Sequence, residues 1–285
     1  MSEEHAEKRP QETSGDGWDH SSDPRFVDYY ARQSLTDENR ARLEGIKEDV
    51  LWALPPERRE GPLEVVDIGC GPGAQSQLWA ADGHSVHGLD VNAELVDLAR
   101  QRAEAAGQEI ELRVGSATDI PWGDETMDVC LLPVLLEHVP SWEACLDEAA
   151  RVLRPGGVLF LSTTNRLCPR QEEFNLPLYS WYPRPVQRHF EELARTTRPD
   201  LANYATYPAV HWFTFYGLRR ELARRGMRSF DRFDSADADG KGWAGRLALG
   251  LIRRVPPARF SAHVLTPYTR LVAIKEEGAR TGDDA

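Results

Sequence analysis

The chain has 285 residues, which is long for one minimal domain and short for two full ones. With 41% hydrophobic residues it can bury a sizeable core, while its formal net charge of −12 argues against a general nucleic-acid binder. No apolar run approaches the roughly 18 residues of a membrane span, and the polar start lacks the apolar segment of a signal peptide, so we expect a cytoplasmic protein. Cys70, Cys130, Cys145 and Cys168 have no metal-ligand or disulfide spacing and are expected to be reduced.

Two segments precede the first apolar run of strand length. Residues 1–22 are polar and charged, which predicts a disordered tail. Over 23–60 apolar residues recur at three- and four-residue steps, which predicts helices, and the Pro55-Pro56 pair ends the second of them. We therefore expect a helical preface in front of a core that begins near residue 61.

The segment 63–73, LEVVDIGCGPG, joins a short β-branched apolar run to three closely spaced glycines. The run suits a strand buried on both faces, as in a parallel sheet. Gly69, Gly71 and Gly73 let the backbone turn sharply and approach a ligand, and a helix over 74–81 should start directly after them. The free N–H groups at that helix start favour a polar or anionic ligand group. A plain tight turn without a ligand is the alternative.

Two cofactor classes use such a loop. Gly69, Gly71 and Ala74 fit the dinucleotide fingerprint, so the glycines alone leave a nicotinamide cofactor open. Asp67, Gly69, Gly71 and Gly73 also match, position for position, the first motif of the class I S-adenosylmethionine-dependent methyltransferases, and here the sequence resembles that family. A buried carboxylate at a strand end needs a partner, and the ammonium group of the cofactor's methionine part would be a suitable one.

A second acid follows at the end of the next predicted strand, 84–90. Asp90 lies about twenty residues past the glycines, where an acid can bind both ribose hydroxyls, and the family uses its strand-end acid in the same way. Asn92 should cap the next helix, through about residue 106, and a third strand is predicted over 110–114.

The segment 115–132 resembles the family's adenine-binding loop and fourth strand. Ser116 stands where the family usually has an Asp, and its hydroxyl is a weaker acceptor than a carboxylate, while Asp119 is nearby. Pattern and resemblance together give these cofactor-binding residues: Asp67, Gly69, Cys70, Gly71, Gly73, Asp90, Val91, Ser116, Ala117 and Pro133.

The string PVLLEHVP, 133–140, follows the fourth strand at the edge where open α/β sheets bind substrates. Glu137 and His138 are predicted to contact substrate, and His138 could accept a proton from a hydroxyl or amine. The string closely resembles the ubiquinone-biosynthesis O-methyltransferases, some of which bind a divalent metal through the Glu-His pair and an acid three residues earlier. That position is Val134 here, so we predict no metal. A structural helix-turn role is an equal alternative for Glu137 and His138.

A helix over 142–153, a turn at 154–157 (RPGG) and a fifth strand over 158–162 are predicted next. The aromatic-rich stretch 164–213 is too long for a simple loop and predicts a lid or insertion. Its predicted substrate residues are Tyr179, Trp181, His211 and Trp212, with His211 as a second candidate base. The alternative is a small helical cap with a core of its own.

The segment 214–275 completes the predicted core. It contains a helix over 214–225, strands over 227–233 and 268–275, and an amphipathic insertion over 240–262. Residues 243–254 are apolar with a basic edge, as in a membrane-surface helix, but the short length of the stretch and the acidic chain favour a pocket closure or a dimer face. A polar tail is expected over 276–285.

These elements predict an α/β, Rossmann-like, doubly wound sheet of seven strands, mostly parallel, with the last strand antiparallel between the fifth and sixth. The core over 61–163 would bind the cofactor, and the resemblance implies that the preface covers it. We expect S-adenosylmethionine-dependent methylation of a small molecule, on a hydroxyl, in secondary or quinone-like metabolism. An N- or C-methyltransferase, a nicotinamide-dependent oxidoreductase and a non-catalytic binding protein are the alternatives. The oligomeric state stays open.

Overall fold

The computed structural model describes residues 24–170, 174–201, 209, 211–238 and 240–278. The predicted tail over 1–22, and the part of the second tail beyond residue 278, lie outside the described residues. No helix in the described ranges is long and apolar enough to cross a membrane.

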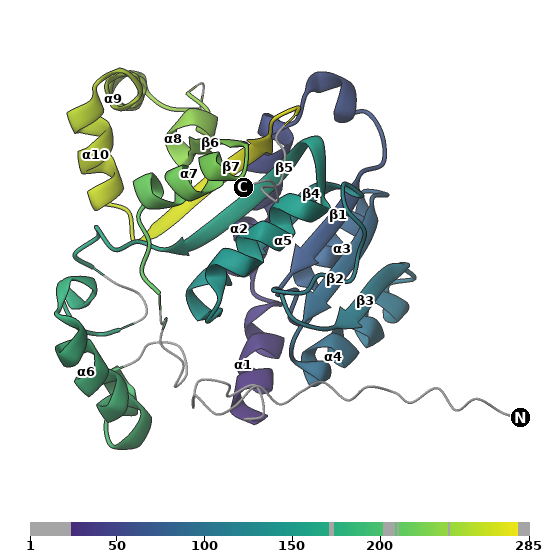
Figure 1. Ribbon diagram of the computed structural model, residues 1–285, viewed down its shortest axis with the longest axis horizontal. Helices are drawn as coiled ribbons and strands as arrows, with labels where there is room; N and C mark the ends of the chain where they lie inside the picture. The colour runs from purple at the N-terminus through teal and green to yellow at the C-terminus, as the bar shows by residue number, and fades with distance from the viewer. Residues whose placement is uncertain (1–23, 171–173, 202–208, 210, 239, 279–285) are drawn as a thin grey trace, which may run out of the picture.

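A seven-stranded sheet with the order β3-β2-β1-β4-β5-β7-β6 forms the centre of the molecule (Figure 1). Strand β7 runs antiparallel to both β5 and β6, and the pairs on the other side are parallel, which confirms the predicted fold. The strands are β1 Glu64–Ile68, β2 Ser85–Asp90, β3 Ile110–Val114, β4 Met127–Pro133, β5 Leu153–Thr164, β6 Met227–Asp231 and β7 Tyr268–Lys275.

Ten α-helices are described around this sheet. They are α1 Pro24–Gln33, α2 Asp37–Ala53, α3 Ala74–Ala81, α4 Ala93–Ala105, α5 Trp142–Val152, α6 Arg184–Thr196, α7 Phe215–Arg224, α8 Arg232–Ser235, α9 Trp243–Arg254 and α10 Pro256–Val264. Asn92, the predicted cap, is the N-cap of α4, and Thr214 is the N-cap of α7; each side chain accepts a hydrogen bond from the backbone N–H three residues later.

Each face of the central strands packs on a different set of helices. One cluster joins Val65 and Phe160 to Val50 of α2, and the other joins Val66 and Leu161 to Leu146 of α5. Alternate residues of a strand point to opposite faces, so a strand between two helical layers needs apolar residues on both faces. This is the physical reason why Val65 and Val66 are both apolar although they are adjacent.

Two predicted boundaries were wrong. The RPGG segment 154–157 is not a turn between helix and strand but lies within β5, where the pairing with β4 jumps from Met127–Leu153 to Val129–Val158. The extra residues of β5 interrupt the regular pairing with β4, and Gly156 among them has φ +77°. Strand β6 ends at Asp231 rather than 233, because the Asp231 side chain caps α8 by accepting from the N–H groups of Phe233 and Asp234.

The insertion between β5 and α7 begins and ends at the sheet. Asn165 and Phe213 form an isolated parallel bridge, and Arg166 N–H donates to the Phe213 carbonyl at 2.7 Å. Between these points α6 packs on a separate apolar cluster that includes Phe174 and Tyr179. Figure 1 shows α6 standing apart from α9 and α10. The insertion therefore has a core of its own.

A group of hydrogen-bonded polar side chains holds α10 against β6. Asp231 accepts from His263 Nε2 at 2.8 Å and from Arg259 Nε at 2.7 Å, and the His263 ring stacks on Phe215. Burial opposes ionisation of Asp231, but the hydrogen bonds from His263 and Arg259 outweigh it and lower its pKa to about 2.

We predict that Asp231→Ala lowers the free energy of unfolding by about 3 kcal/mol, because it leaves the buried His263 and the half-buried Arg259 without their carboxylate. Since the folded pKa of Asp231 is depressed, the carboxylate stabilises above pH 4 and its effect is lost as the pH falls from about 4 to about 2. Urea unfolding at pH 7 measures the change. Asp200→Ala, which removes an exposed ion pair with Arg198, is the control and should change little. Equal stability of the two variants would contradict the assignment.

Candidate cofactor and acceptor site

The glycine loop between β1 and α3 uses three left-handed residues in a row of five. Gly69, Gly71 and Gly73 have φ of +75°, +51° and +81°. The N–H groups of Gly69 and Cys70 both donate to the Leu89 carbonyl of β2, at 2.7 and 3.1 Å, which fixes the start of the loop. A Cβ at Gly73 would lie 2.9 Å from the Ala99 side chain, whereas a Cβ at Gly71 would meet nothing within 4 Å. Gly73 thus permits helix packing, and Gly71 borders open space.

Asp67 lies under this loop with its carboxylate fully buried. One oxygen accepts from Ser76 Oγ at 2.7 Å, and the other, Oδ1, has no hydrogen-bond partner among the described residues. Burial raises the pKa of Asp67 to about 6, although the Ser76 hydrogen bond opposes the rise. Buried polar atoms are almost always paired, so a free carboxylate oxygen here fits an ammonium group of a bound ligand.

Gln75, in the first turn of α3, presents a second unsatisfied polar group. Its side chain is buried, and neither amide atom has a partner in the part of the chain that the structure describes. The segment from Asp67 to Gln75 therefore contains both an acceptor and an amide that a polar ligand could satisfy.

Asp90, at the end of β2, connects the glycine loop to the next helix. Its Oδ2 accepts from Gly71 N–H and its Oδ1 from Asn92 N–H, both at 2.8 Å. Burial raises the pKa of Asp90, and these backbone N–H groups oppose the rise. Each carboxylate oxygen can accept more than one hydrogen bond, so both remain able to accept from ribose hydroxyls.

The preface is fastened to the glycine loop by one side chain of α4. Arg102 donates to Ser34 Oγ and the Ala31 carbonyl in the preface, at 2.9 and 3.0 Å, and to the Pro72 carbonyl at 3.3 Å. Helix α1 therefore lies beside α4, close to the glycine loop. That the preface covers the cofactor stays a prediction.

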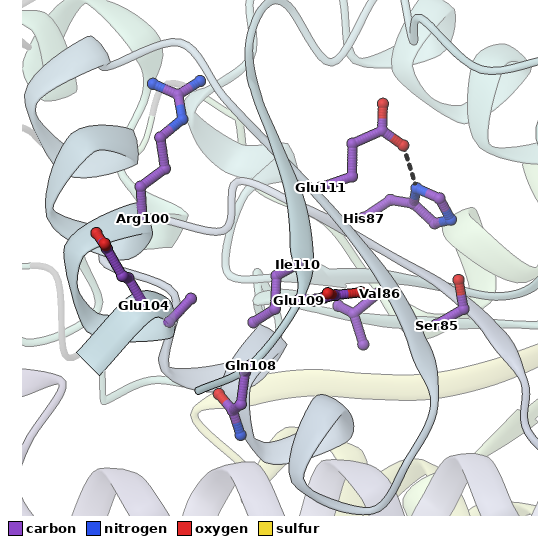
Figure 2. Close-up of a pocket in the computed structure, with 10 residues that line it drawn as sticks. Ser85, Val86, His87, Arg100, Glu104, Gln108, Glu109, Ile110 and Glu111 are labelled. Atoms are coloured by element: carbon purple, nitrogen blue, oxygen red, sulfur yellow. Dashed lines mark hydrogen bonds and ion pairs between the residues drawn. The ribbon is translucent and has the colours of Figure 1, made fainter. Parts of the chain in front are cut away.

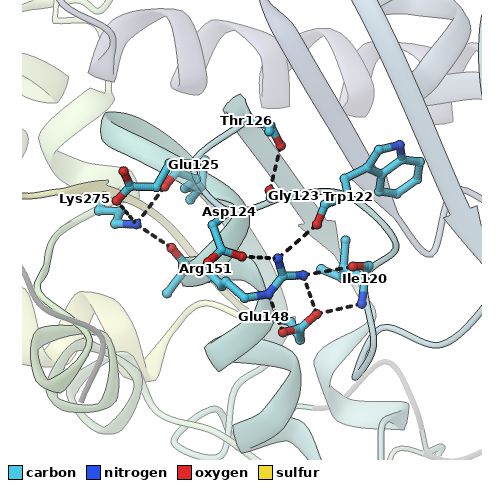
Figure 3. A network of polar contacts seen from close by, with 11 residues as sticks. Ile120, Trp122, Gly123, Asp124, Glu125, Thr126, Glu148, Arg151 and Lys275 are labelled. Atoms are coloured by element: carbon cyan, nitrogen blue, oxygen red, sulfur yellow. Dashed lines mark hydrogen bonds and ion pairs between the residues drawn. The ribbon is translucent and has the colours of Figure 1, made fainter. Parts of the chain in front are cut away.

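The predicted adenine loop is held against α5 by Arg151 (Figure 3). Its guanidinium donates to the carbonyls of Ile120 and Trp122, both at 2.9 Å, and pairs with Glu148 and Asp124 at 2.7 Å. Glu148 in turn accepts from Ile120 N–H at 2.7 Å. This network fixes a loop that has no regular secondary structure.

The remaining predicted cofactor residues surround the same edge of the sheet. Ser116 is exposed and its hydroxyl bonds Thr118 Oγ1 at 2.8 Å, with Ala117 between them. Val91 is exposed beyond Asp90, and Pro133 ends β4. The Cys70 side chain instead packs in an apolar cluster with Val96 and Leu112, so only its backbone faces the loop.

Glu137 and His138 lie on a 3₁₀ turn, Leu136–His138, directly after β4. Glu137 is fully buried, and its Oε2 accepts from Thr163 Oγ1 of β5 at 2.8 Å. His138 is partly buried, and burial lowers the pKa of His138 to about 4. At neutral pH the imidazole is therefore uncharged and able to accept a proton. Val134 stands at the position where some of the resembling methyltransferases have a metal-binding acid. Its φ is +54°, which is unusual for a β-branched residue.

His211 comes from the far end of the insertion to the same turn. Its backbone N–H donates to the Glu137 carbonyl at 3.2 Å, its carbonyl accepts from Thr164 Oγ1, and Nε2 lies 3.3 Å from the Pro140 carbonyl oxygen. Burial lowers the pKa of His211, partly opposed by the hydrogen bond to Pro140. The two candidate bases, His138 and His211, therefore lie on two segments that are joined by a backbone hydrogen bond.

The predicted aromatic substrate residues fall into two groups. Tyr179 and Trp212 pack in the separate core of the insertion, where Tyr179 stacks on Phe174 at 4.1 Å and donates to Glu191. Trp181 is 54% exposed and its indole N–H donates to the Arg166 carbonyl. Tyr179 and Trp212 therefore have a packing role, which favours the helical cap with its own core, and their assignment as substrate contacts stays a prediction.

A shallow hollow on another part of the sheet is unrelated to this edge (Figure 2). It is lined by the first residues of β2 and β3, including Ser85 and Ile110, and by α4. The first residues of parallel strands lie opposite the glycine loop, so this hollow is not the cofactor site. In the described ranges, no three His, Cys, Asp or Glu side chains gather as metal ligands would.

Comparison with known proteins identifies the family. Residues 66–161 match a family model described as a methyltransferase domain. The ubiquinone biosynthesis O-methyltransferase of Xylella fastidiosa is 30% identical over 174 residues, which cover 60% of this chain and 70% of that protein. The chain belongs to the class I S-adenosylmethionine-dependent methyltransferases. S-adenosylmethionine is the methyl donor of this family, which removes the nicotinamide alternative.

A second relative matches over a shorter stretch, and a solved structure matches over most of the chain. The ubiquinone biosynthesis O-methyltransferase of Rhizobium etli is 36% identical over 104 residues, or 36% of this chain and 42% of the relative, so the match spans less than half of that protein. A Haloferax volcanii putative methyltransferase, solved in complex with the Trm112 methyltransferase activator, has the same fold with a TM-score of 0.52, 18% identity, and coverage of 88% of this chain and 98% of its own.

Sequence reasoning missed several residues that build this methyltransferase site. Arg102 and Arg151 stand singly on helix faces, where nothing local distinguishes them from solvated arginines. Gln75 was missed because no local sequence signal distinguishes it from other polar residues in the first turn of a helix. Thr163 could have been found, because β5 ends in the polar run 162–165, which is unusual for a buried strand.

We predict that affinity for S-adenosylmethionine depends on the ionisation of Asp67. The carboxylate is charged above its pKa of about 6, so binding should be constant above pH 7 and about tenfold weaker at pH 5, where about a tenth of the groups are ionised. Isothermal titration calorimetry between pH 5 and 8 measures this. Asp67→Asn should bind weakly with no pH dependence, while Asp97→Asn, an exposed residue of α4, should behave as the wild type. A pH-independent wild type would contradict the role of Asp67.

Proposed function

We propose that this methyltransferase transfers a methyl group to a hydroxyl of a small aromatic molecule. The observation that carries the proposal is the uncharged, partly buried imidazole of His138, placed after β4 beside Glu137 at the edge that contains the glycine loop. Support also comes from the relatives, whose names describe O-methylation in ubiquinone biosynthesis.

The chain's contribution would be mainly alignment. S-adenosylmethionine supplies an electrophilic methyl group on a sulfonium sulfur. Asp67 would hold the ammonium group of the cofactor and Asp90 its ribose hydroxyls, while the backbone of the glycine loop would contact the part between them. These contacts together would fix the direction of the methyl group. His138 would accept the proton of the acceptor hydroxyl as the new bond to carbon forms.

His138 and His211 differ in how freely they can act as bases. The described residues give the His138 ring no hydrogen-bond partner, whereas His211 Nε2 already faces the Pro140 carbonyl. A hydrogen bond to a carbonyl requires a protonated nitrogen and leaves only the other nitrogen to accept a proton. This difference favours His138 as the base and His211 as a residue that closes the insertion over the turn.

A pair of probes with the same ring tests the acceptor class. Purified protein is incubated with S-adenosylmethionine and either 4-methylcatechol or 4-methylaniline, and the products are measured by mass spectrometry. We expect methylation of the catechol and none of the arylamine. Methylation of the arylamine alone, or of ring carbon in the catechol, would overturn transfer to oxygen while leaving the methyltransferase family intact.

We predict that His138→Gln lowers kcat on the accepted catechol about 100-fold, since the loss of a general base typically costs that much. Calorimetric affinity for S-adenosylmethionine should stay unchanged, and so should activity of His189→Gln, which removes an exposed imidazole from α6. Because the pKa of His138 is about 4, this group gives kcat no acidic limb between pH 5 and 9. If His211→Gln lowers kcat and His138→Gln does not, the assignment of the base is reversed.

A further inference from the structure

Helix α9 carries apolar side chains on its solvent side as well as on its buried side. Leu249 is buried and Ile252 partly so, and they mark the face packed on the protein. Trp243, Leu247 and Leu251 recur every four residues on the other side and are 77%, 68% and 54% exposed. A surface helix normally has polar residues there, so a continuous apolar stripe in solvent indicates a binding surface.

The orientation of α9 is fixed by hydrogen bonds from its last turn to the segment around α8. Arg253 donates to the carbonyls of Phe233, Asp234 and Ala236 at 2.8, 3.1 and 2.6 Å, which anchors the last turn of α9 over α8. The stripe of Trp243, Leu247 and Leu251 therefore faces outward as a property of the fold. Figure 1 shows α9 and α10 together at the upper left rim of the molecule, outside the sheet.

The stripe is flanked by cations. The side chains of Lys241, Arg246 and Arg254 are exposed and make no hydrogen bond or ion pair with any residue that the structure describes. No Asp or Glu occurs between residues 240 and 275, although the whole chain has a net charge of −12. The strongly acidic protein thus exposes one local surface that combines apolar and unpaired cationic side chains.

Two occupants would bury the stripe, a second copy of the chain or a lipid surface. A two-fold dimer through α9 would place the arginines of one copy against those of the other, which is unfavourable. An anionic membrane offers hydrocarbon to the apolar stripe and phosphate groups to the cations at the same interface. Charge complementarity therefore selects the membrane.

We propose that α9 docks this protein on anionic membrane surfaces, lying in the interface with Trp243, Leu247 and Leu251 inserted. Phe260 of α10 and Leu265, the residue after that helix, are also exposed apolar side chains, at 46% and 77%. The chain then returns from α10 into β7 at Tyr268, which pairs with Thr164 at the end of β5. Docking through α9 would accordingly hold the acceptor edge of the sheet close to the lipid.

Vesicle co-sedimentation tests the proposal on the full chain. We expect binding to vesicles of phosphatidylcholine with 30% phosphatidylglycerol, little binding to pure phosphatidylcholine, and release by 0.5 M NaCl. Leu247→Glu should reduce the bound fraction at least tenfold, while Val186→Glu, an exposed apolar residue of α6, should not. Arg246→Glu should weaken binding, and Arg188→Glu on α6 is its charge-matched control.

Three results would overturn the proposal. These are no binding to the anionic vesicles, equal binding to neutral ones, and equal loss in the α9 variants and their α6 controls. Light scattering provides a further readout: a dimer that Leu247→Glu dissociates, without vesicle binding by the wild type, would assign the stripe to self-association. Far-UV circular dichroism and cofactor titration of each variant separate loss of docking from loss of folding, and none of these results bears on methyl transfer.

Discussion

The burial of the Asp67 carboxylate at the end of β1 is the constraint from which the rest of the site follows. Burial alone would neutralise this group, and Ser76 satisfies only one of its two oxygens. The protein keeps it there because the glycine loop folds back over it and Asp90 ties that loop to β2. A ligand that brought a positive charge to Asp67 would offset the free-energy cost of burying its carboxylate, which is the physical basis of the role proposed for Asp67 in binding the cofactor.

The elements around this centre differ in how strongly they are attached. The predicted adenine loop has no regular secondary structure. Arg151 holds it in place through hydrogen bonds to two backbone carbonyls and ion pairs with two carboxylates. The preface depends on Arg102 for its contact with the glycine loop. The insertion after β5 has its own apolar core and meets the sheet through the bridge between Asn165 and Phe213. A part with its own core can change in sequence without disturbing the cofactor site, which suits a role in selecting the acceptor.

The α9 surface shows how an acidic protein can still approach a negatively charged partner. Net charge controls long-range approach, but within a Debye length of roughly 8 Å the local arrangement decides. At α9 that arrangement is cationic, because acids are absent from the sequence between residues 240 and 275. Local contact and remote repulsion would together make docking reversible.

The sequence by itself determined the cofactor half of this protein. The strand-glycine-helix segment, the acid at 90 and the order of later motifs are short-range patterns, because each depends on backbone geometry within a few residues. They predicted the doubly wound sheet of seven strands and the antiparallel last strand between the fifth and sixth, and they carried the resemblance to the family. Tertiary structure alone decided that Tyr179 packs inside the insertion, that RPGG lies within β5, and that Leu247 faces solvent while Leu249 does not. These outcomes depend on which distant segment covers a residue, and the residues themselves carry no local signal of that partner.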